Sequence, residues 1–390
     1  MTAIIIIAGL ACYALLTILR RDFGVYFIVL LLPVYQIRFS VFGIPTTFLE
    51  WMLAILAIVA LVGNFRSILA AIKTPQSFWI ALLLLATGLS VFISPVPIKA
   101  AGIWKAYFFE PVVFFFLIRA LISDEARRRR LVNCIAISVL YLSMFGLYQF
   151  LTLENLPPSW WAVDVASRRI TSLLNHPNAL ALLLGPMLAF LVFWPGKTVL
   201  SWTALVSGFL ALYLSFSRAS WLAILITTLI VGGFSKHWKK MLIAGVLMAT
   251  LVMIVPFSRE KILTLASGTD PSKENRYVLW SAAVDMLRQS PFFGVGLMGF
   301  HEKFKTYPLG PDQVVQNYPH NFFLNFWLET GFLGLVAIIA ILIGFFRRLK
   351  KELKPPLLAA MLVILLHGLV DVPYFKNDLS IFFWMLLALS

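Results

Sequence analysis

The sequence predicts an all-α, polytopic helical membrane protein. Of its 390 residues, 61% are hydrophobic and only 13% are charged, whereas a soluble domain carries about 25% charged residues. Apolar runs of about 18 residues or more recur along the chain, and each is long enough to cross a hydrocarbon core of about 30 Å. The runs lack the alternation of barrel strands, so helices are expected. We treat residues 1–390 as one membrane domain.

The apolar runs give 13 candidate spans, and the second is short enough to be half of a broken helix, so we expect 12 or 13. Arg20 and Arg21 follow the first run rather than precede it, which argues against a cleaved signal peptide. Cys12 and Cys134 lie within apolar runs, so no disulfide is expected. The candidate spans are residues 2–19, 23–35, 46–63, 76–93, 100–119, 130–151, 178–194, 198–215, 219–234, 238–256, 320–346, 355–371 and 378–390.

The distribution of Lys and Arg predicts the orientation. The loops after every other span, beginning with the first, hold 18 of them, and the alternate short loops hold 6. The long loop 257–319 is left out, because long loops cross the membrane largely regardless of charge. The first set is therefore expected in the cytoplasm and loops 152–177, 215–218 and 257–319 outside. The net charge of +15 thus reflects membrane orientation, and we expect no nucleic-acid partner.

The long outer loop contains a predicted amphipathic helix. Asp270 and Pro271 form a helix-start signal, and Ser290-Pro291 ends the pattern. Between them, one face carries apolar residues and the other polar residues, which is typical of a helix resting on the surface of the bundle. The apolar face comprises Tyr277, Trp280, Val284 and Leu287, and the opposite face Ser281, Asp285 and Arg288.

The stretch YPHNFFLNFWLETGFLGL (318–335) places polar groups inside an apolar span. Asn321, Asn325 and Glu329 recur every four residues, so they form one stripe on a helix that faces protein or a wet cavity. For Asn325 and Glu329 we favour interhelical hydrogen bonds. His320 differs, because it lies at the outer end, where an imidazole can act as a base at neutral pH.

Several cations are predicted at the same outer level. Arg276 lies in the amphipathic helix, and Arg218 lies in a very short outer turn. Arg168 and Arg169 precede LNHPN (174–178), in which Asn178 begins a span. Each arginine has a structural alternative, a headgroup contact or a side chain that reaches from the membrane to water. Lys105, with Glu110 deeper in its span, is a weaker candidate of the same kind.

Taken together, these residues predict an anionic, phosphate-bearing ligand. Several cations and one titratable base at one surface suit a phosphate group. The sequence has no HExxH motif and no Cys/His ligand set. We therefore expect an arginine-held phosphate, with no metal and no cofactor.

Four segments of the chain carry a resemblance to a known family. They are RRITSLLNHPNALALLL (168–184), LSFSRASWLAILI (214–226), NRYVLWSAAVDMLRQSPFFGVGLMGF (275–300) and PHNFFLNFWLETGFLGL (319–335). Together they resemble the O-antigen ligase and polymerase superfamily of bacterial envelope proteins. The order and spacing of these segments carry the resemblance, which spans roughly residues 168–346.

The resemblance implies a multi-spanning transferase of the bacterial cytoplasmic (inner) membrane with its active site outside. Such proteins move a glycan from undecaprenyl diphosphate to a hydroxyl acceptor and need no metal. By this resemblance, His320 is the catalytic residue and Arg218 and Arg276 hold the diphosphate. Arg168, Arg169, Asn178, Lys105 and Asn321 are further possible substrate-binding residues.

Three branches of the superfamily share the donor and differ in the acceptor. A ligase uses a lipid A-core-like sugar, a polymerase uses another lipid-linked glycan, and a protein O-oligosaccharyltransferase uses Ser or Thr; we rank the ligase first. From a different class, a transporter or flippase of an anionic lipid would place charged groups at the midplane of inverted repeats; the sequence shows no such repeat, and the candidate cations lie at one surface. The expected partners are the undecaprenyl-diphosphate-linked donor, a lipid-anchored or glycan acceptor, and membrane lipids.

Overall fold

The computed structural model describes residues 2–162, 165–233, 271–308, 314–352 and 354–390, with isolated positions between 238 and 263. The predicted span 238–256 and the predicted cap Asp270 lie largely or wholly outside the described residues. The described helices are α1 (Thr2–Leu19), α2 (Arg21–Leu30), η1 (Leu32–Gln36), α3 (Phe48–Ile72), α4 (Pro75–Ile93), α5 (Pro97–Trp104), η2 (Lys105–Phe109), α6 (Glu110–Leu121), α7 (Glu125–Thr152), η3 (Pro158–Trp160), η4 (Val165–Ser167), α8 (Pro177–Phe193), α9 (Val199–Leu214), α10 (Arg218–Gly233), α13 (Pro271–Gln289), α14 (Gly299–Phe304), α15 (Phe322–Lys351), α16 (Pro355–His367) and α17 (Asn377–Ala388).

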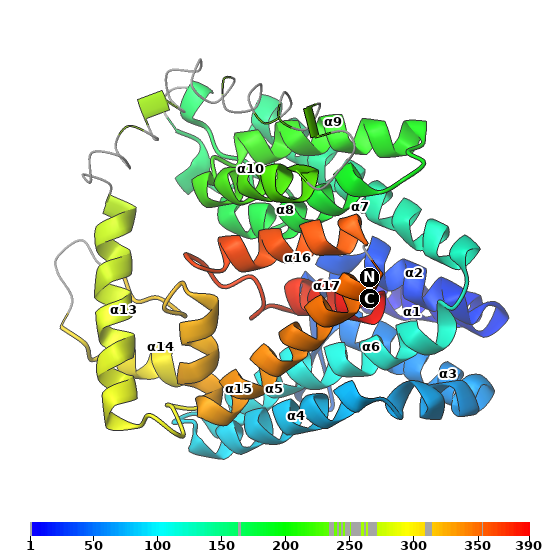
Figure 1. Cartoon of the computed structure of the whole chain (residues 1–390), viewed down its shortest axis with the longest axis horizontal. Helices are drawn as coiled ribbons and strands as arrows, with labels where there is room; N and C mark the ends of the chain where they lie inside the picture. Colours follow the sequence, from blue (N-terminus) through cyan, green and yellow to red (C-terminus); the bar gives the residue numbers. More distant parts are fainter. Residues whose placement is uncertain are drawn as a thin grey trace.

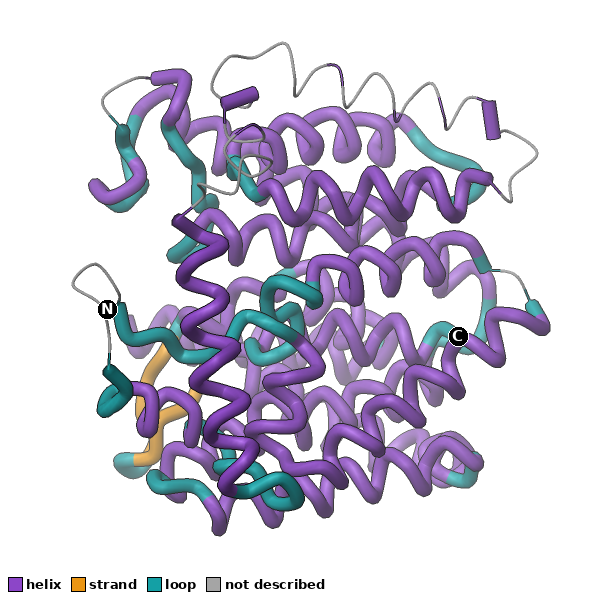
Figure 2. Tube along the Cα trace, turned by 60° about the vertical axis from the view of Figure 1, so that its left-hand side comes forward, coloured by secondary structure: helices purple, strands orange, loops and turns teal. Residues whose placement is uncertain are grey.

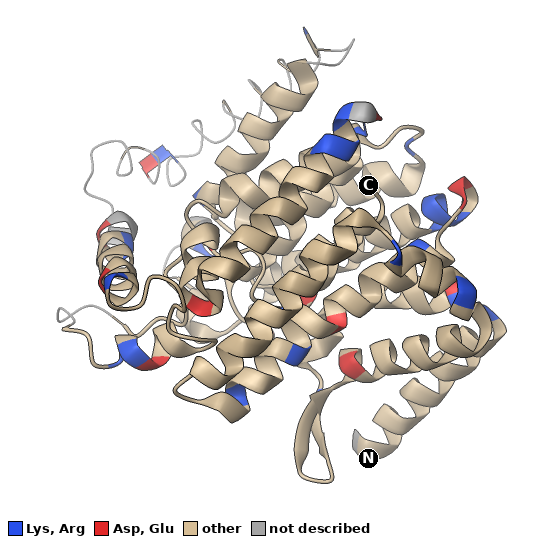
Figure 3. Cartoon of the chain, turned by 60° about the horizontal axis from the view of Figure 1, so that its bottom comes forward, with Lys and Arg blue, Asp and Glu red and all other residues tan. Residues whose placement is uncertain are grey.

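The all-α, polytopic class is confirmed. Among the described residues, five helical segments are long and apolar enough to cross a membrane, and six more apolar helices are shorter, at 10–17 residues. Most of them lie along one direction of the bundle (Figure 1), and charged residues gather mainly at their ends (Figure 3). The second candidate span is indeed broken, since α2 ends at Leu30 and a 3₁₀ turn follows. The count of 12 or 13 spans stays a prediction.

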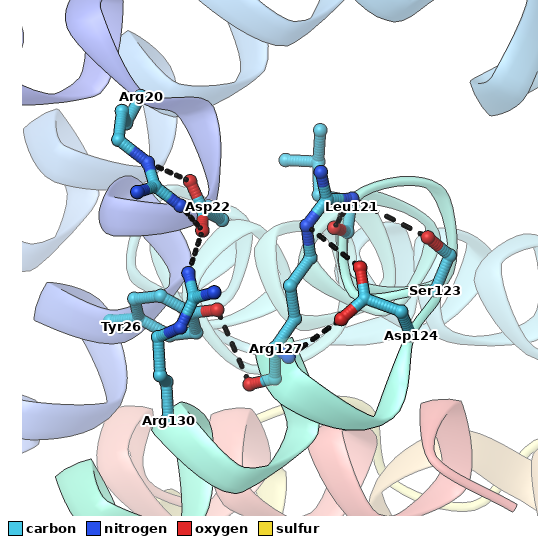
Figure 4. A network of polar contacts seen from close by, with 8 residues as sticks. All are labelled: Arg20, Asp22, Tyr26, Leu121, Ser123, Asp124, Arg127 and Arg130. Atoms are coloured by element: carbon cyan, nitrogen blue, oxygen red, sulfur yellow. Dashed lines mark hydrogen bonds and ion pairs between the residues drawn. The ribbon is translucent and has the colours of Figure 1, made fainter.

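The helix ends that carry the predicted cytoplasmic loops are joined to one another, and we call this the basic end. Asp22 of α2 accepts hydrogen bonds from Arg20 at 2.7 Å and from Arg130 of α7 at 3.1 Å. Tyr26 donates to the carbonyl of Arg127, so α2 and the start of α7, about 100 residues apart in sequence, meet there (Figure 4). The Asp22 carboxylate is nearly buried and offsets the repulsion between the two guanidinium groups around it.

A small β-hairpin departs from the purely helical expectation. Strands β1 (Arg38–Val41) and β2 (Ile44–Thr47) pair in antiparallel register between η1 and α3 (Figure 2). Phe42 and Gly43 form the turn with φ of 50° and 79°, and positive φ at both central residues is the geometry of a two-residue hairpin. The Phe-Gly pair between two short β-prone runs is the signal in the sequence, although an apolar composition conceals it.

The amphipathic helix is confirmed as α13, but only part of its predicted apolar face, Trp280 and Leu287, packs on the protein. Leu279, Ala282, Ala283, Met286 and Leu287 are the buried residues, in a cluster with α14 and the outer part of α15. By contrast, two residues of the predicted apolar face, Tyr277 and Val284, are 56% and 40% exposed. Two adjacent alanines let the helix backbone approach its neighbours closely, so the buried stripe follows small residues rather than the largest apolar ones. Helix α13 runs across the ends of the spanning helices (Figure 1).

Helix α15 breaks at Gly331, in the middle of the stretch that contains Glu329. Gly331 has φ of 72°, a backbone conformation that suits glycine. The loop after α13 fills the break: Phe332 N–H donates to the carbonyl of Phe292 at 2.9 Å, and Val295 N–H donates to that of Leu328 at 2.7 Å. The break therefore attaches the outer loop to the outer third of α15. Asn325 and Glu329 are both fully buried there, so they face protein.

We predict that Gly331→Ala destabilises the protein by about 1–3 kcal/mol, because a side chain at this φ is strained. A Cβ there would also lie 2.7 Å from the carbonyl oxygen of Phe292. The matched control is Gly344→Ala in the same helix, where the nearest side-chain atom is 3.8 Å away and alanine is favoured by up to about 1 kcal/mol. Thermal melting of both variants in detergent tests this; equal melting temperatures would contradict the prediction.

Candidate functional site

A cavity of about 320 Å³ lies at the end of the bundle opposite the basic end, and we call it the outer cavity. Its lining residues come from α13, the start of α8 and the segments before α15; helix α13 lies on the left of Figure 1. None of the described residues that line it is acidic. The lining residues are His176, Asn178, Asn275, Arg276, Val278, Leu279, Phe304, Val314, Gln316 and His320.

His320 lines the outer cavity in a strained backbone conformation. Its φ is 49°, which is uncommon for a residue other than glycine. Asn321 follows as the N-cap of α15, and its side chain accepts a hydrogen bond from Leu324 N–H. The imidazole Nδ1 lies 2.9 Å from the Asp371 carboxylate, and the His320 side chain is 31% exposed while that of Asp371 is 8% exposed. The ring is therefore held on one side and open on the other.

The segment 368–371, between α16 and α17, receives the polar groups of the outer cavity, and we call it the anchor strip. The carbonyl of Gly368 accepts from Phe322 N–H at 2.7 Å. The carbonyl of Leu369 accepts from the Asn321 side chain at 2.9 Å, and that of Val370 from Arg276 Nε at 3.0 Å. The fourth residue, Asp371, holds His320.

Asp371 is held in its charged form. Burial alone would raise the pKa of this carboxyl group, but the hydrogen bond and the positive charge of His320 outweigh it and lower the pKa well below its usual range. Its carboxylate also accepts a hydrogen bond from Val372 N–H at 2.8 Å. A carboxylate can only accept, so His320 Nδ1 carries the proton in this pair. In neutral His320, Nε2 is then the basic nitrogen.

Arg169 and Asn178 meet beside the outer cavity. Arg169 donates through Nε to the carbonyl of Ser215 and through Nη2 to Asn178 Oδ1, both at 2.9 Å. Trp160 lies 5.2 Å from the Arg169 guanidinium. Burial and then the positive charge of Arg218 lower the pKa of Arg169 to about 10. Arg169 therefore remains cationic at neutral pH, and Arg218 lies close enough to act on it.

His176 is the second histidine of the outer cavity and the N-cap of α8. Its Nδ1 accepts a hydrogen bond from Asn178 N–H at 3.1 Å, so this nitrogen must be unprotonated. Burial, followed by the charge of Arg169, lowers the pKa of His176 to about 4. His176 is thus neutral at pH 7 and serves as a helix cap.

Two predicted residues lie away from the outer cavity. Arg168 donates to the carbonyl of Phe150 and lies 5.5 Å from its ring. Lys105 forms an ion pair with Glu50 at 2.8 Å, in the π-helical turn η2. The structure thus brings together His320, Asn321, Arg276, Arg169, Asn178 and, through its charge, Arg218.

The anchor strip was missed by the sequence interpretation. Asp371 occupies a short outer turn, LVDVP (369–373), at the same level as the predicted cations. The predicted span 355–371 places Asp371 inside a helix, whereas α16 ends at His367; a lone acid near the outer cations is the signal that the sequence offers. The three carbonyl contacts depend on backbone geometry and leave no trace in the residue types.

The fold and the outer cavity define a class: a multi-pass membrane protein with a carboxylate-held histidine among arginines at one end of its bundle. Residues 203–339, about a third of the chain, match the family model described as O-antigen ligase. No curated protein matches the chain. The matched part of the chain is therefore similar to the O-antigen ligase family, in agreement with the resemblance found in the sequence. The match includes Arg218, Arg276 and His320.

We predict that acid weakens the fold through His176. Its pKa in the folded protein, about 4, lies below the ordinary value of about 6.5. Its contribution to stability is therefore complete above pH 6.5 and is lost as the pH falls from 6.5 towards 4. Thermal melting at pH 7, 6 and 5 should show a larger loss for the wild type than for His176→Asn, which keeps a capping side chain. Parallel losses in both proteins would count against the assignment.

Proposed function

We propose that this protein transfers a glycan from undecaprenyl diphosphate to a hydroxyl acceptor on the outer face of the bacterial cytoplasmic membrane. His320 is the general base, and Arg276 and Arg218 hold the diphosphate, with Arg169 adding positive charge. The preferred acceptor is a lipid A-core-like sugar. The single observation that carries the proposal is the His320–Asp371 pair at 2.9 Å, beside a cavity that Arg276 also lines.

The proton transfer follows from the tautomer of His320. Asp371 accepts from Nδ1–H, so Nε2 keeps its lone pair and takes the proton of the acceptor hydroxyl. The acceptor oxygen forms a bond to C1 of the donor sugar as the bond from C1 to the phosphate oxygen breaks. Undecaprenyl diphosphate leaves with that electron pair, and His320 then releases its proton to water. A one-step displacement of this kind inverts the anomeric centre.

The arginines act on the leaving group. Negative charge grows on the diphosphate as the C1–oxygen bond breaks, and guanidinium groups fixed beforehand stabilise that charge. Arg276 is fixed because its Nε is bound to the carbonyl of Val370. The same strip holds His320, so the position of the base relative to the phosphate-binding group is set by four consecutive residues.

We predict that His320→Ala lowers the transfer rate by about 100- to 10,000-fold, because a positioned general base contributes this much. The gene is deleted, and wild-type or variant copies are returned. Surface glycolipids are then separated on a gel, and the amount of protein in the membrane is checked. Restoration of the long glycan by His320→Ala to the wild-type level would refute the proposed mechanism.

The arginine role is tested in the same strain with a matched pair of conservative variants. Arg276→Lys keeps the charge but loses the planar fork of donors, and it is expected to lose most glycan transfer. Arg168→Lys is the control, since Arg168 binds the carbonyl of Phe150 away from the outer cavity. Accumulation of carrier-linked polymer supports the ligase branch, whereas single carrier-linked repeats indicate a polymerase.

We predict that Asp371→Asn lowers kcat by at least about 100-fold, because an amide can donate to Nδ1 and so leave the proton on Nε2. The KM for the donor should change little, since the arginines that hold the diphosphate remain. Steady-state kinetics of the purified protein in lipid discs measure both constants. A rise in KM with unchanged kcat would assign Asp371 to donor binding instead.

A further inference from the structure

A second cavity, of about 370 Å³, lies at the basic end, and we call it the basic-end cavity. It lies where the start of α7, the end of α8, the start of α16 and the end of α17 come together. Its floor is apolar and buried, with Phe190, Val132 and Leu357. Its rim carries two cations, Arg128 in the first turn of α7 and Lys354 at the N-cap of α16.

The cations at the rim have unused hydrogen-bonding capacity. Arg128 Nε is buried without a hydrogen-bond partner among the described residues, which is costly for a charged group. Lys354 forms one ion pair, at 3.2 Å, with Glu352, whose side chain is 76% exposed. Such exposed pairs are weak, typically about 0–1 kcal/mol, so a buried anion can compete for the ammonium group.

The nearby carboxylate does not neutralise this site. Glu125 also lines the cavity, but it is 60% exposed and lies 3.3 Å from Arg129 in an ion pair. The rim therefore keeps a net positive charge. A phosphate group would meet the guanidinium group of Arg128 and the ammonium group of Lys354, which both line the cavity.

The remaining walls suit a lipid rather than a free anion. Phe193, Trp194 and Pro195 form a partly exposed apolar edge next to the cations, and Trp194 stacks on Phe190 with ring centroids 5.6 Å apart. Tryptophan is enriched at membrane interfaces. Basic pockets between helices at the positive side of a membrane bind anionic headgroups.

We propose that the basic-end cavity binds an anionic phospholipid. Its phosphate lies between Arg128 and Lys354, and its acyl chains leave along Phe193 and Trp194. This site is separate from the outer cavity and does not rest on the proposed glycan transfer. The lipid joins α7, α8, α16 and α17 at the basic end. It therefore stabilises α16 at the end opposite the one that leads into the anchor strip.

Lipid titration of the full-length protein tests the proposal. The protein is purified in detergent, stripped of lipid and titrated with dioleoyl phosphatidylglycerol, dioleoyl phosphatidylcholine or inorganic phosphate. Native mass spectrometry counts the bound lipids, and thermal melting reports the stabilisation. We expect phosphatidylglycerol to bind at least 10-fold more tightly than phosphatidylcholine and to raise the melting temperature, whereas inorganic phosphate should have little effect.

The variant pair is Arg128→Gln with Lys354→Gln, against Arg66→Gln with Lys350→Gln as control. Both pairs remove two positive charges from the predicted cytoplasmic side, but Arg66 and Lys350 are exposed and do not line the cavity. The first pair should lose the preference for phosphatidylglycerol, and the control should keep it. On wild-type protein, raising the salt from about 0.05 M to about 0.5 M should weaken phosphatidylglycerol binding only slightly, because salt screens a buried ion pair less than an exposed one.

Three results would overturn the proposal. Equal binding of the two lipids would mean that headgroup charge is not recognised. Equal loss in both variant pairs would assign the effect to overall charge rather than to the basic-end cavity. Stabilisation by inorganic phosphate equal to that by phosphatidylglycerol would identify a site for a free anion.

Discussion

The geometry of the outer cavity depends on one short backbone segment, the anchor strip 368–371. Hydrogen bonds from Phe322, Asn321, Arg276 and His320 end on four consecutive residues. These donors come from α13 and α15, which have only a small interface with each other. The strip follows directly from α16, which packs along α8 in the core, so the reactive groups are held against the core of the bundle. Holding groups in place before reaction is what makes electrostatic stabilisation effective.

Charge explains why this arrangement needs a single carboxylate. Burial penalises a lone histidinium or carboxylate, but an adjacent pair of opposite charge is tolerated when its hydrogen bonds are satisfied. Asp371 meets this condition through His320 and Val372. The described residues that line the outer cavity include histidines and an arginine but no acid, so the field there favours an incoming anion. The basic end shows the converse arrangement, because Asp22 and Glu125 form ion pairs with neighbouring arginines.

The sequence predicted what depends on hydropathy and charge. The spanning helices follow from apolar runs, and the shared level of Arg276, Arg169 and His320 follows from the distribution of basic residues over loops. What it could not predict depends on contacts between distant backbone atoms. The break at Gly331 exists because the carbonyl of Phe292 reaches Phe332, and the anchor strip binds partners 46 to 94 residues away in sequence, of which Arg276 is the farthest. The buried face of α13 differs in part from the predicted one because Ala282 and Ala283 are fully buried, which residue size does not reveal.

The most direct measurement of the central claim is a structure of the protein with undecaprenyl diphosphate bound. We expect the diphosphate oxygens within hydrogen-bond distance of Arg276, with His320 Nδ1 still on Asp371 and Nε2 facing the position of the acceptor. Arg276 should keep its contact with Val370. A diphosphate bound away from Arg276, or an imidazole turned away from Asp371 in the bound state, would contradict the role assigned to the anchor strip.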